Sequence, residues 1–250
     1  MKKMVFFLII SLCYSASCFA GKRFTFVTVN FPPYYSENLP AKGWVSEIVK
    51  KALEIQGYRV DIEFMTWEEA LENTREGYND GLLGAYYTRN RAQQYYFSAP
   101  IAQARIGFFR RKDVNISFQE VTELKGYKIG VIKGYATSKS FDSADNLNKI
   151  VVKNLNEGLV KLFNKEIDLM ADSQAVGKYQ LKLLEERYPG ISKKIKFIKP
   201  VLAINKLYVA ISKKTTNAYR KLMDFNKGLR KLYMNGSFRR IKKKHKKYIQ

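Results

Sequence analysis

The chain has 250 residues, 46% of them hydrophobic, so it is long enough for one large domain or for two lobes of ordinary size. Its formal net charge is +23, and it carries only two cysteines and one histidine. This composition argues against a disulfide-rich scaffold, a histidine metal cluster and a catalytic Ser-His triad.

The N-terminus has the organisation of a secretory signal. Two lysines after Met1 precede an apolar segment over residues 4–12, and a short stretch then leads to Ala20. The apolar segment is too short to span a membrane as a mature helix. We therefore expect a signal peptide over residues 1–20 and a periplasmic mature protein. Lipoprotein anchoring at Cys18 would want an aliphatic residue where Ser15 stands, so we do not expect it.

Both cysteines, Cys13 and Cys18, lie inside this leader. Cleavage would leave a mature chain without a thiol, and therefore without a disulfide or a cysteine-ligated metal. The one histidine, His245, stands among lysines near the C-terminus. We predict no metal site and no cofactor.

The positive charge is concentrated at the end of the chain. Residues 193–250 hold 19 of the 45 Lys and Arg residues but only one of the 22 acids, Asp224. Such a run is most often a solvated face, and attraction to an anionic membrane surface or to an acidic partner is the alternative. In a cytoplasmic protein the same run would suggest nucleic-acid binding, but the expected export argues against it.

The mature chain begins with alternating strands and helices. β-branched and aromatic residues predict a strand over 24–29, which the two prolines of the 30–35 loop (NFPPYY) must end. Apolar residues spaced i, i+3, i+4, i+7 and i+8 predict a helix from Val45 that stops by Gly57. Alternation then predicts a strand over 60–64.

The next segment has the signature of a helix start. Thr66 followed three residues later by Glu69 is a capping box, so a helix should begin at Trp67. Gly77 is a natural place for this helix to end. Trp67 would therefore lie at a helix start, just past a strand.

Residues 80–100 carry the most informative pattern. The apolar run 82–85 is typical of a strand buried on both faces, and a polar turn over 88–91 follows it directly. Arg91 would then lie just beyond the carboxyl end of a parallel strand, where open α/β sheets place their ligands. The planar guanidinium can hold a carboxylate by two parallel hydrogen bonds. We predict that Arg91 anchors the ligand.

The second half of the chain repeats the alternation. Residues 124–134 predict a strand that runs into a glycine turn, and residues 135–138 would begin a helix whose free N–H groups bind an anion. A strand over 167–173 ends in Asp172, with Ser173 free to cap the following helix. The other expected elements are a strand over 106–109, helices around 157–163 and over 175–186, strands over 195–201 and 207–211, and helices over 217–233 and 237–247.

These motifs resemble those of the solute-binding proteins of bacterial ABC importers, in the polar-amino-acid-binding family. The resemblance covers nearly the whole mature chain. It is carried by the Pro32-Pro33-Tyr34 loop, by Gly84 leading into T-x-x-R at 88–91, by the aromatic-Phe-Ser-x-Pro segment at 96–100, and by the L-x-G-x-x-x-x-V-x-x-G pattern at 124–134.

The resemblance implies a two-lobed, periplasmic-binding-protein-like α/β fold, each lobe a mostly parallel sheet flanked by helices. Residues 21–108 and 203–250 would form lobe 1, and residues 109–202 would form lobe 2. Two hinge strands, near 108–112 and 200–207, would join the lobes. The ligand would lie in the cleft between them.

The resemblance also implies roles for individual residues. Arg91 would bind the carboxylate of an amino acid and Asp172 its α-ammonium group, although Asp172 could instead cap a helix or pair with a basic residue. Trp67 would stack on the ligand side chain or serve as a core residue, and Phe31 and Tyr34 would border the cleft or pack inside a rigid turn. The other candidate ligand-binding residues are Asn30, Tyr86, Thr88, Ala136 and Thr137.

Three positions depart from the family pattern. Where amino-acid binders usually show G-x-T-x-T-x-E-R, residues 84–91 read GAYYTRNR, which places Tyr86 and Asn90 at a threonine and an acid. Asn30 stands where a first-lobe acid often assists the ammonium. With fewer negative groups an ammonium is held less firmly, and the tyrosines would suit a larger or flatter solute. The ligand is an amino acid or another small carboxylate.

We therefore expect a monomeric binding protein, not an enzyme, that delivers this solute to an ABC transporter permease. A sensor module that reports its ligand state to a membrane receptor is the alternative. A dehydratase-like enzyme on the same fold, with Asp172 or Glu47 as general acid or base, is a third possibility. We do not expect nucleic-acid binding.

Overall fold

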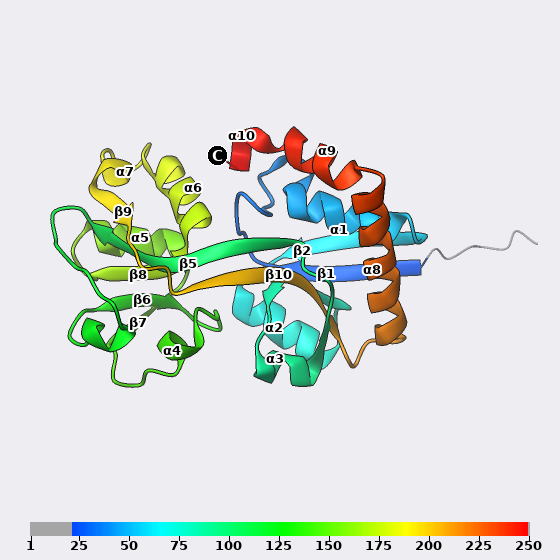
Figure 1. Ribbon diagram of the computed structural model, residues 1–250, viewed down its shortest axis with the longest axis horizontal. Helices are drawn as coiled ribbons and strands as arrows, with labels where there is room; N and C mark the ends of the chain where they lie inside the picture. The colour runs from blue at the N-terminus through cyan, green and yellow to red at the C-terminus, as the bar shows by residue number, and fades with distance from the viewer. Residues whose placement is uncertain (1–21, 250) are drawn as a thin grey trace, which may run out of the picture.

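A computed structural model describes residues 22–249 and shows two α/β lobes joined by two long strands (Figure 1). The expected signal peptide, with Cys13 and Cys18, lies outside the described residues. Within 22–249, no helix combines the length and the apolar character needed to cross a bilayer.

Lobe 1 is built from both ends of the chain. Its elements are β1 (Lys22–Thr28), η1 (Pro40–Lys42), α1 (Trp44–Glu54), β2 (Tyr58–Phe64), α2 (Trp67–Glu76), β3 (Gly81–Tyr86), α3 (Arg89–Gln94), β4 (Tyr95–Phe97), α8 (Ala218–Met234), α9 (Ser237–Lys244) and α10 (Lys246–Ile249).

Lobe 2 is built from the middle of the chain. Its elements are η2 (Val121–Leu124), β6 (Ile129–Ile132), α4 (Lys139–Asp142), β7 (Lys149–Val152), α5 (Leu155–Phe163), β8 (Leu169–Ser173), α6 (Gln174–Leu184), α7 (Ile191–Lys194) and β9 (Ile195–Phe197). The long strands β5 (Ala102–Arg111) and β10 (Ala203–Ser212) extend into both lobes.

One hydrogen-bonded path runs through both lobes, in the order β2-β1-β3-β10-β5-β8-β6-β7. In lobe 1, β1 pairs in parallel with β2 and β3, and in lobe 2, β6 pairs in parallel with β7 and β8. Residues 102–106 of β5 pair antiparallel with 203–207 of β10 and connect the lobes. The lobe boundaries expected at residues 108 and 202 stay a prediction.

Local sequence explains why these elements form where they do. Thr66 accepts a hydrogen bond from the Glu69 N–H, and the Glu69 carboxylate accepts one from the Thr66 N–H, which closes the predicted capping box. Gly77 ends α2 in the left-handed conformation. Every residue of β3 is buried, as its apolar run predicts. The apolar stripe of α1 is buried at Val45, Ile48, Val49, Ala52 and Leu53.

The C-terminal helices complete lobe 1 by packing on α1. Glu47 of α1 accepts hydrogen bonds from Lys244 Nζ at 3.0 and 3.1 Å, and its Oε2 lies 2.7 Å from Nε2 of the buried His245. On α8, Gly228 lies so close to Ala52 of α1 that a Cβ at this position would collide with the Ala52 carbonyl group. The helix pair therefore depends on a residue without a side chain.

We predict that Gly228→Ala destabilises the protein, although glycine to alanine normally stabilises a helix interior by about 1 kcal/mol. The added methyl group must push α8 away from α1, an overpacking cost of about 1–3 kcal/mol. Chemical denaturation measures the change. Lys227→Ala, at an exposed neighbour on α8, should stay within about 0.5 kcal/mol of the original protein. A more stable Gly228→Ala protein would show that α8 and α1 are not in this close contact.

Candidate functional site

The two lobes meet at a cleft that contains three hollows. A central cavity of ≈ 20 Å³, about the room that one water needs, is lined from lobe 1 by Phe31, Trp67, Tyr86 and Arg91 and from lobe 2 by Tyr135 and Ala136. A wide groove of ≈ 680 Å³ opens on the side of Thr88, Arg91 and Thr137. A narrow groove of ≈ 380 Å³ opens on the side of Asn30, Phe31 and Asp172.

Arg91 lies where the central cavity meets the wide groove. The expected polar turn is in fact the first turn of α3, because the Thr88 hydroxyl accepts a hydrogen bond from the Arg91 N–H and caps a helix. The guanidinium is partly buried, which lowers the pKa of Arg91. It donates to the carbonyl oxygens of Tyr86 (2.9 Å) and Gly134 (2.8 Å) and lies 5.3 Å from the centre of the Trp67 ring.

The carbonyl oxygen of Gly134 connects the lobes across the cleft. It accepts from Arg91, and it also accepts from the Trp67 indole N–H at 3.1 Å. Next to it, Lys133 pairs with Glu68 of α2 at 2.5 Å. Residues 133–137, which we call the 133–137 loop, are thus held against lobe 1 by three side chains.

The expected start of the helix after Gly134 is wrong. The helix predicted to begin at residue 135 begins at Lys139, because the Ser138 hydroxyl caps it at the Phe141 N–H. The Thr137 N–H is therefore not free to meet a ligand. It donates to both carboxylate oxygens of Asp142, at 3.2 and 3.0 Å. Burial raises the pKa of Asp142, and the Thr137 N–H partly opposes this shift.

Asp172 is the next-to-last residue of β8; it lines the narrow groove and is almost fully buried. One carboxylate oxygen accepts from the Ser173 N–H at 2.5 Å, and within residues 22–249 the other has no hydrogen-bond partner. Burial raises the pKa of Asp172 to about 7. In this conformation Asp172 forms no ion pair with a described basic residue. The Ser173 hydroxyl, which we expected to cap α6, does not do so.

Three tyrosines fill the space around the central cavity. Tyr35, Tyr86 and Tyr135 all have pKa values raised mainly by burial, with the charge of Asp172 adding to the shift. The pKa of Tyr35 also responds to Arg91, so this ring lies in the field of both charged groups. Tyr35 reaches this position because Gly84, at a positive φ of 83°, leaves room for its ring and accepts from its hydroxyl at 3.3 Å.

Not every predicted residue reaches the central cavity. Phe31 lines it and makes an edge contact with Tyr86, with ring centres 6.4 Å apart. Tyr34 instead packs against the hinge, where its hydroxyl donates to the Gln103 carbonyl at 2.9 Å, and burial raises the pKa of Tyr34 to about 12. Asn30 faces the narrow groove and accepts hydrogen bonds from Ser36 and Glu37 of its own loop.

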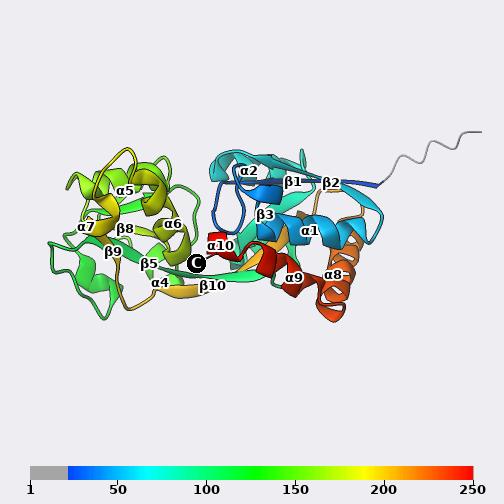
Figure 2. The same cartoon turned by 90° about the horizontal axis from the view of Figure 1, so that it is seen from above.

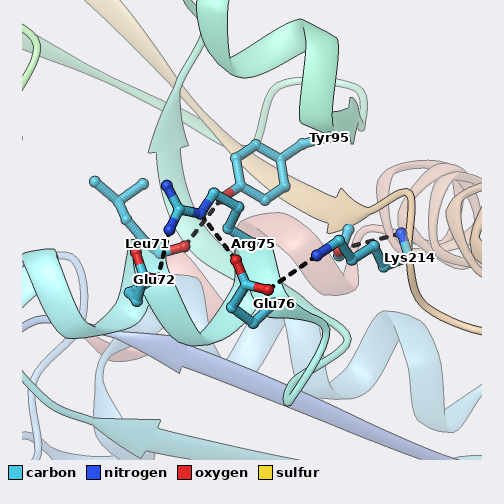
Figure 3. Close-up of polar contacts among 7 residues, drawn as sticks. Leu71, Glu72, Arg75, Glu76, Tyr95 and Lys214 are labelled. Atoms are coloured by element: carbon cyan, nitrogen blue, oxygen red, sulfur yellow. Dashed lines mark hydrogen bonds and ion pairs between the residues drawn. The ribbon is translucent and has the colours of Figure 1, made fainter.

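Polar contacts along α2 order the lobe 1 wall of the wide groove (Figure 3). The Tyr95 hydroxyl donates to the Leu71 carbonyl at 3.1 Å. Arg75 pairs with Glu76 at 3.1 Å, and Glu76 pairs in turn with Lys214 at 3.0 Å. These charges are exposed, so the pairs fix the orientation of side chains more than they stabilise the fold.

Sequence reasoning did not single out four groups that form the site: the Gly134 carbonyl, Tyr135, Tyr35 and Asp142. Gly134 ends the L-x-G-x-x-x-x-V-x-x-G pattern and Tyr135 follows it, while Tyr35 adjoins the predicted Tyr34, so both stretches carried a signal. Asp142 carried none, since its contact with Thr137 depends on how a short helix folds back on its own N-terminus.

Solved structures with this fold were found at low sequence identity. A variant of ArgBP from T. maritima has a TM-score of 0.74 and 18% identity, covering 89% of this chain and 94% of that one. The amino acid ABC transporter substrate-binding protein AbpA from Streptococcus pneumoniae, bound to L-arginine, has a TM-score of 0.73 and 18% identity over 91% and 96% of the two chains. A histidine kinase sensor domain with similarity to periplasmic binding proteins has a TM-score of 0.76 and 19% identity over 90% and 96%.

These likenesses show the fold alone, and a search of curated proteins gave no match. The comparison of the sequence with family models shows the family as well as the fold. The model of the family described as bacterial extracellular solute-binding proteins, family 3, matches residues 25–248, which is nearly all of the described chain. This chain belongs to the family 3 bacterial extracellular solute-binding proteins.

Proposed function

We propose that this protein captures a small carboxylate-bearing solute, an amino acid or a related compound, between its lobes and delivers it to an ABC importer. The observation that carries the proposal is the state of Arg91. Its guanidinium is partly buried in the cleft, yet it forms no ion pair within residues 22–249 and bonds only to carbonyl oxygens. A charge withdrawn from water needs a partner of opposite sign, and a ligand carboxylate would be that partner.

Binding requires the lobes to separate first. The central cavity has room for about one water, so no amino acid fits inside it while the Gly134 carbonyl is in contact with Arg91. Two paired strands at 102–106 and 203–207 are the only backbone connections between the described lobes, which suits hinge motion. The ligand would replace the Gly134 carbonyl at Arg91 and then be enclosed as the 133–137 loop returns.

The opposite end of the ligand would meet Asp172. One Asp172 oxygen and the Tyr86 hydroxyl are buried without a hydrogen-bond partner among residues 22–249, and buried polar atoms in proteins normally have partners. An ammonium group would pair with the ionised form of Asp172. The aromatic walls formed by Phe31, Trp67 and Tyr135 would cover the rest of the solute.

Transport is favoured over catalysis because the proposed roles of Arg91 and Asp172 are to bind opposite ends of a solute. We propose a periplasmic monomer that delivers the solute to a permease.

The second candidate function is that of a sensor module, which the likeness to a histidine kinase sensor domain favours. Deleting the gene separates the two: loss of solute uptake supports transport, and intact uptake with an altered transcriptional response supports sensing.

The first test of the site is Arg91→Ala. A thermal-shift screen of amino acids, organic acids and oligopeptides identifies a ligand, because binding to the native state raises its melting temperature. Removing one partner of a charge-assisted pair costs about 2–5 kcal/mol, so Arg91→Ala should weaken a carboxylate ligand at least about thirtyfold. Arg89→Ala, an exposed neighbour on α3, should bind normally. Equal affinity of the Arg91 and Arg89 variants would place the anchor elsewhere.

The second test uses pH. Burial raises the pKa of Asp172 to about 7, so below that pH an ammonium must displace a proton from Asp172 in order to bind. The affinity for an amino acid should therefore fall by up to about tenfold per unit as the pH drops below 7. Titration calorimetry measures this slope, and Asp172→Asn should remove it. A carboxylate without an ammonium group should not weaken at low pH; if an amino acid behaves in the same way, its ammonium is not bound by Asp172.

A further inference from the structure

The outward side of α8 combines exposed apolar side chains with cations. Helical spacing places six residues in one stripe along the helix, which we call the α8 outer face: Tyr219, Arg220, Met223, Lys227, Arg230 and Met234. Tyr219 is 62% exposed, Met223 49% and Met234 77%, although all three are large apolar residues. The other side of α8 packs against α1 through Leu222, Phe225 and Leu229.

Most Lys and Arg side chains of the three C-terminal helices, α8, α9 and α10, form no ion pair within residues 22–249. Lys221 pairs with Asp80 and Lys244 with Glu47, and the single acid of the segment, Asp224, accepts a hydrogen bond from Tyr58. Ten further exposed residues form no ion pair within 22–249: Arg220, Lys227, Arg230, Lys231, Arg239, Arg240, Lys242, Lys243, Lys246 and Lys247. The surface therefore presents unbalanced positive charge over three consecutive helices.

The α8 outer face is separate from the cleft. Figure 1 places α8 near the end of lobe 1 that is far from lobe 2, and Figure 2, seen from above, places it there as well. None of the residues of this face lines the central cavity, the wide groove or the narrow groove. Its exposed methionines and tyrosine are not needed to bind the solute.

We propose that the α8 outer face docks on the surface of an anionic phospholipid bilayer. Lipid headgroups supply a continuous negative surface, which suits cations spread along a convex helix rather than gathered in a pocket. Tyr219, Met223 and Met234 stand among these cations and enter the boundary between headgroups and acyl chains, as the apolar side chains of interfacial helices do. If the partner were instead an acidic protein, the protein would not bind lipid vesicles.

Vesicle co-sedimentation of the purified protein at low salt tests this proposal. The vesicles are phosphatidylcholine alone, or phosphatidylcholine with about one third phosphatidylglycerol. We expect binding only to the second kind. Lys227→Glu with Arg230→Glu should weaken it at least about tenfold, because both contacts become repulsive. Met223→Ser with Met234→Ser should weaken it about threefold or more at unchanged charge.

The matched control is Lys196→Glu with Lys199→Glu on lobe 2, which changes the net charge by the same amount at exposed positions far from α8. It should bind vesicles within about twofold of the original protein. Equal weakening by this control would reduce the effect to bulk charge and overturn the proposal. So would a lack of binding to phosphatidylglycerol vesicles, or unchanged binding of the methionine variant, which would indicate a general polyanion site. Thermal unfolding followed by circular dichroism confirms that each variant is folded.

Discussion

The central interaction of the cleft is made by the Arg91 guanidinium, which donates hydrogen bonds to carbonyl oxygens and forms no ion pair within residues 22–249. Arg91 reaches across to Gly134 of lobe 2, and Trp67 donates to the same oxygen. Hydrogen bonds from a cation to a neutral carbonyl are weaker than those to an anion. Under the proposed function, a ligand carboxylate would therefore replace the Gly134 carbonyl at Arg91 with a gain in free energy, and the contact between the lobes would not compete strongly with the solute.

The charges of lobe 2 shape the other half of the site. Asp142 takes the Thr137 N–H, the group that the expected helix start would have offered to an anion. Within residues 22–249, one oxygen of Asp172 has no hydrogen-bond partner, and burial raises the pKa of this carboxyl group. Under the proposed function, Arg91 of lobe 1 and Asp172 of lobe 2 would bind groups of opposite charge, so a solute with both signs of charge would favour the closed state.

Local sequence patterns predicted most of the fold, because caps, glycine stops and apolar runs determine where its helices and strands begin and end. The capping box at Thr66, the left-handed Gly77 and the buried run of β3 all depend on residues within a few positions of each other. The same locality explains the errors. A T-x-x-R turn and the first turn of a capped helix look alike in sequence, so α3 was missed.

The site itself depends on distant contacts. Arg91 donates to the carbonyl oxygen of Gly134, which lies 43 positions along the chain and on the other lobe. No sequence pattern marks this backbone oxygen as an acceptor. The start of α4 was also predicted too early, because Ser138, and not the residue after Gly134, supplies the cap. Sequence could place Arg91 and Asp172 at the ends of their strands, but it could not show which groups face them when the lobes close.

The distribution of charge separates two parts of the molecule. In the cleft, Arg91 and Asp172 are partly or fully withdrawn from water, so burial shifts the pKa of each. The C-terminal helices do the reverse. They bury Leu222 and Phe225, bond His245 to Glu47, and expose most of their Lys and Arg side chains to solvent. An acidic residue three or four positions from each cation on the same helix would pair with it at little cost in helix stability. Residues 193–250, however, contain a single acid, Asp224. Neither the packing of α8 on α1 nor the proposed binding of a small solute requires that excess, and the proposed docking of the α8 outer face on an anionic bilayer would use it.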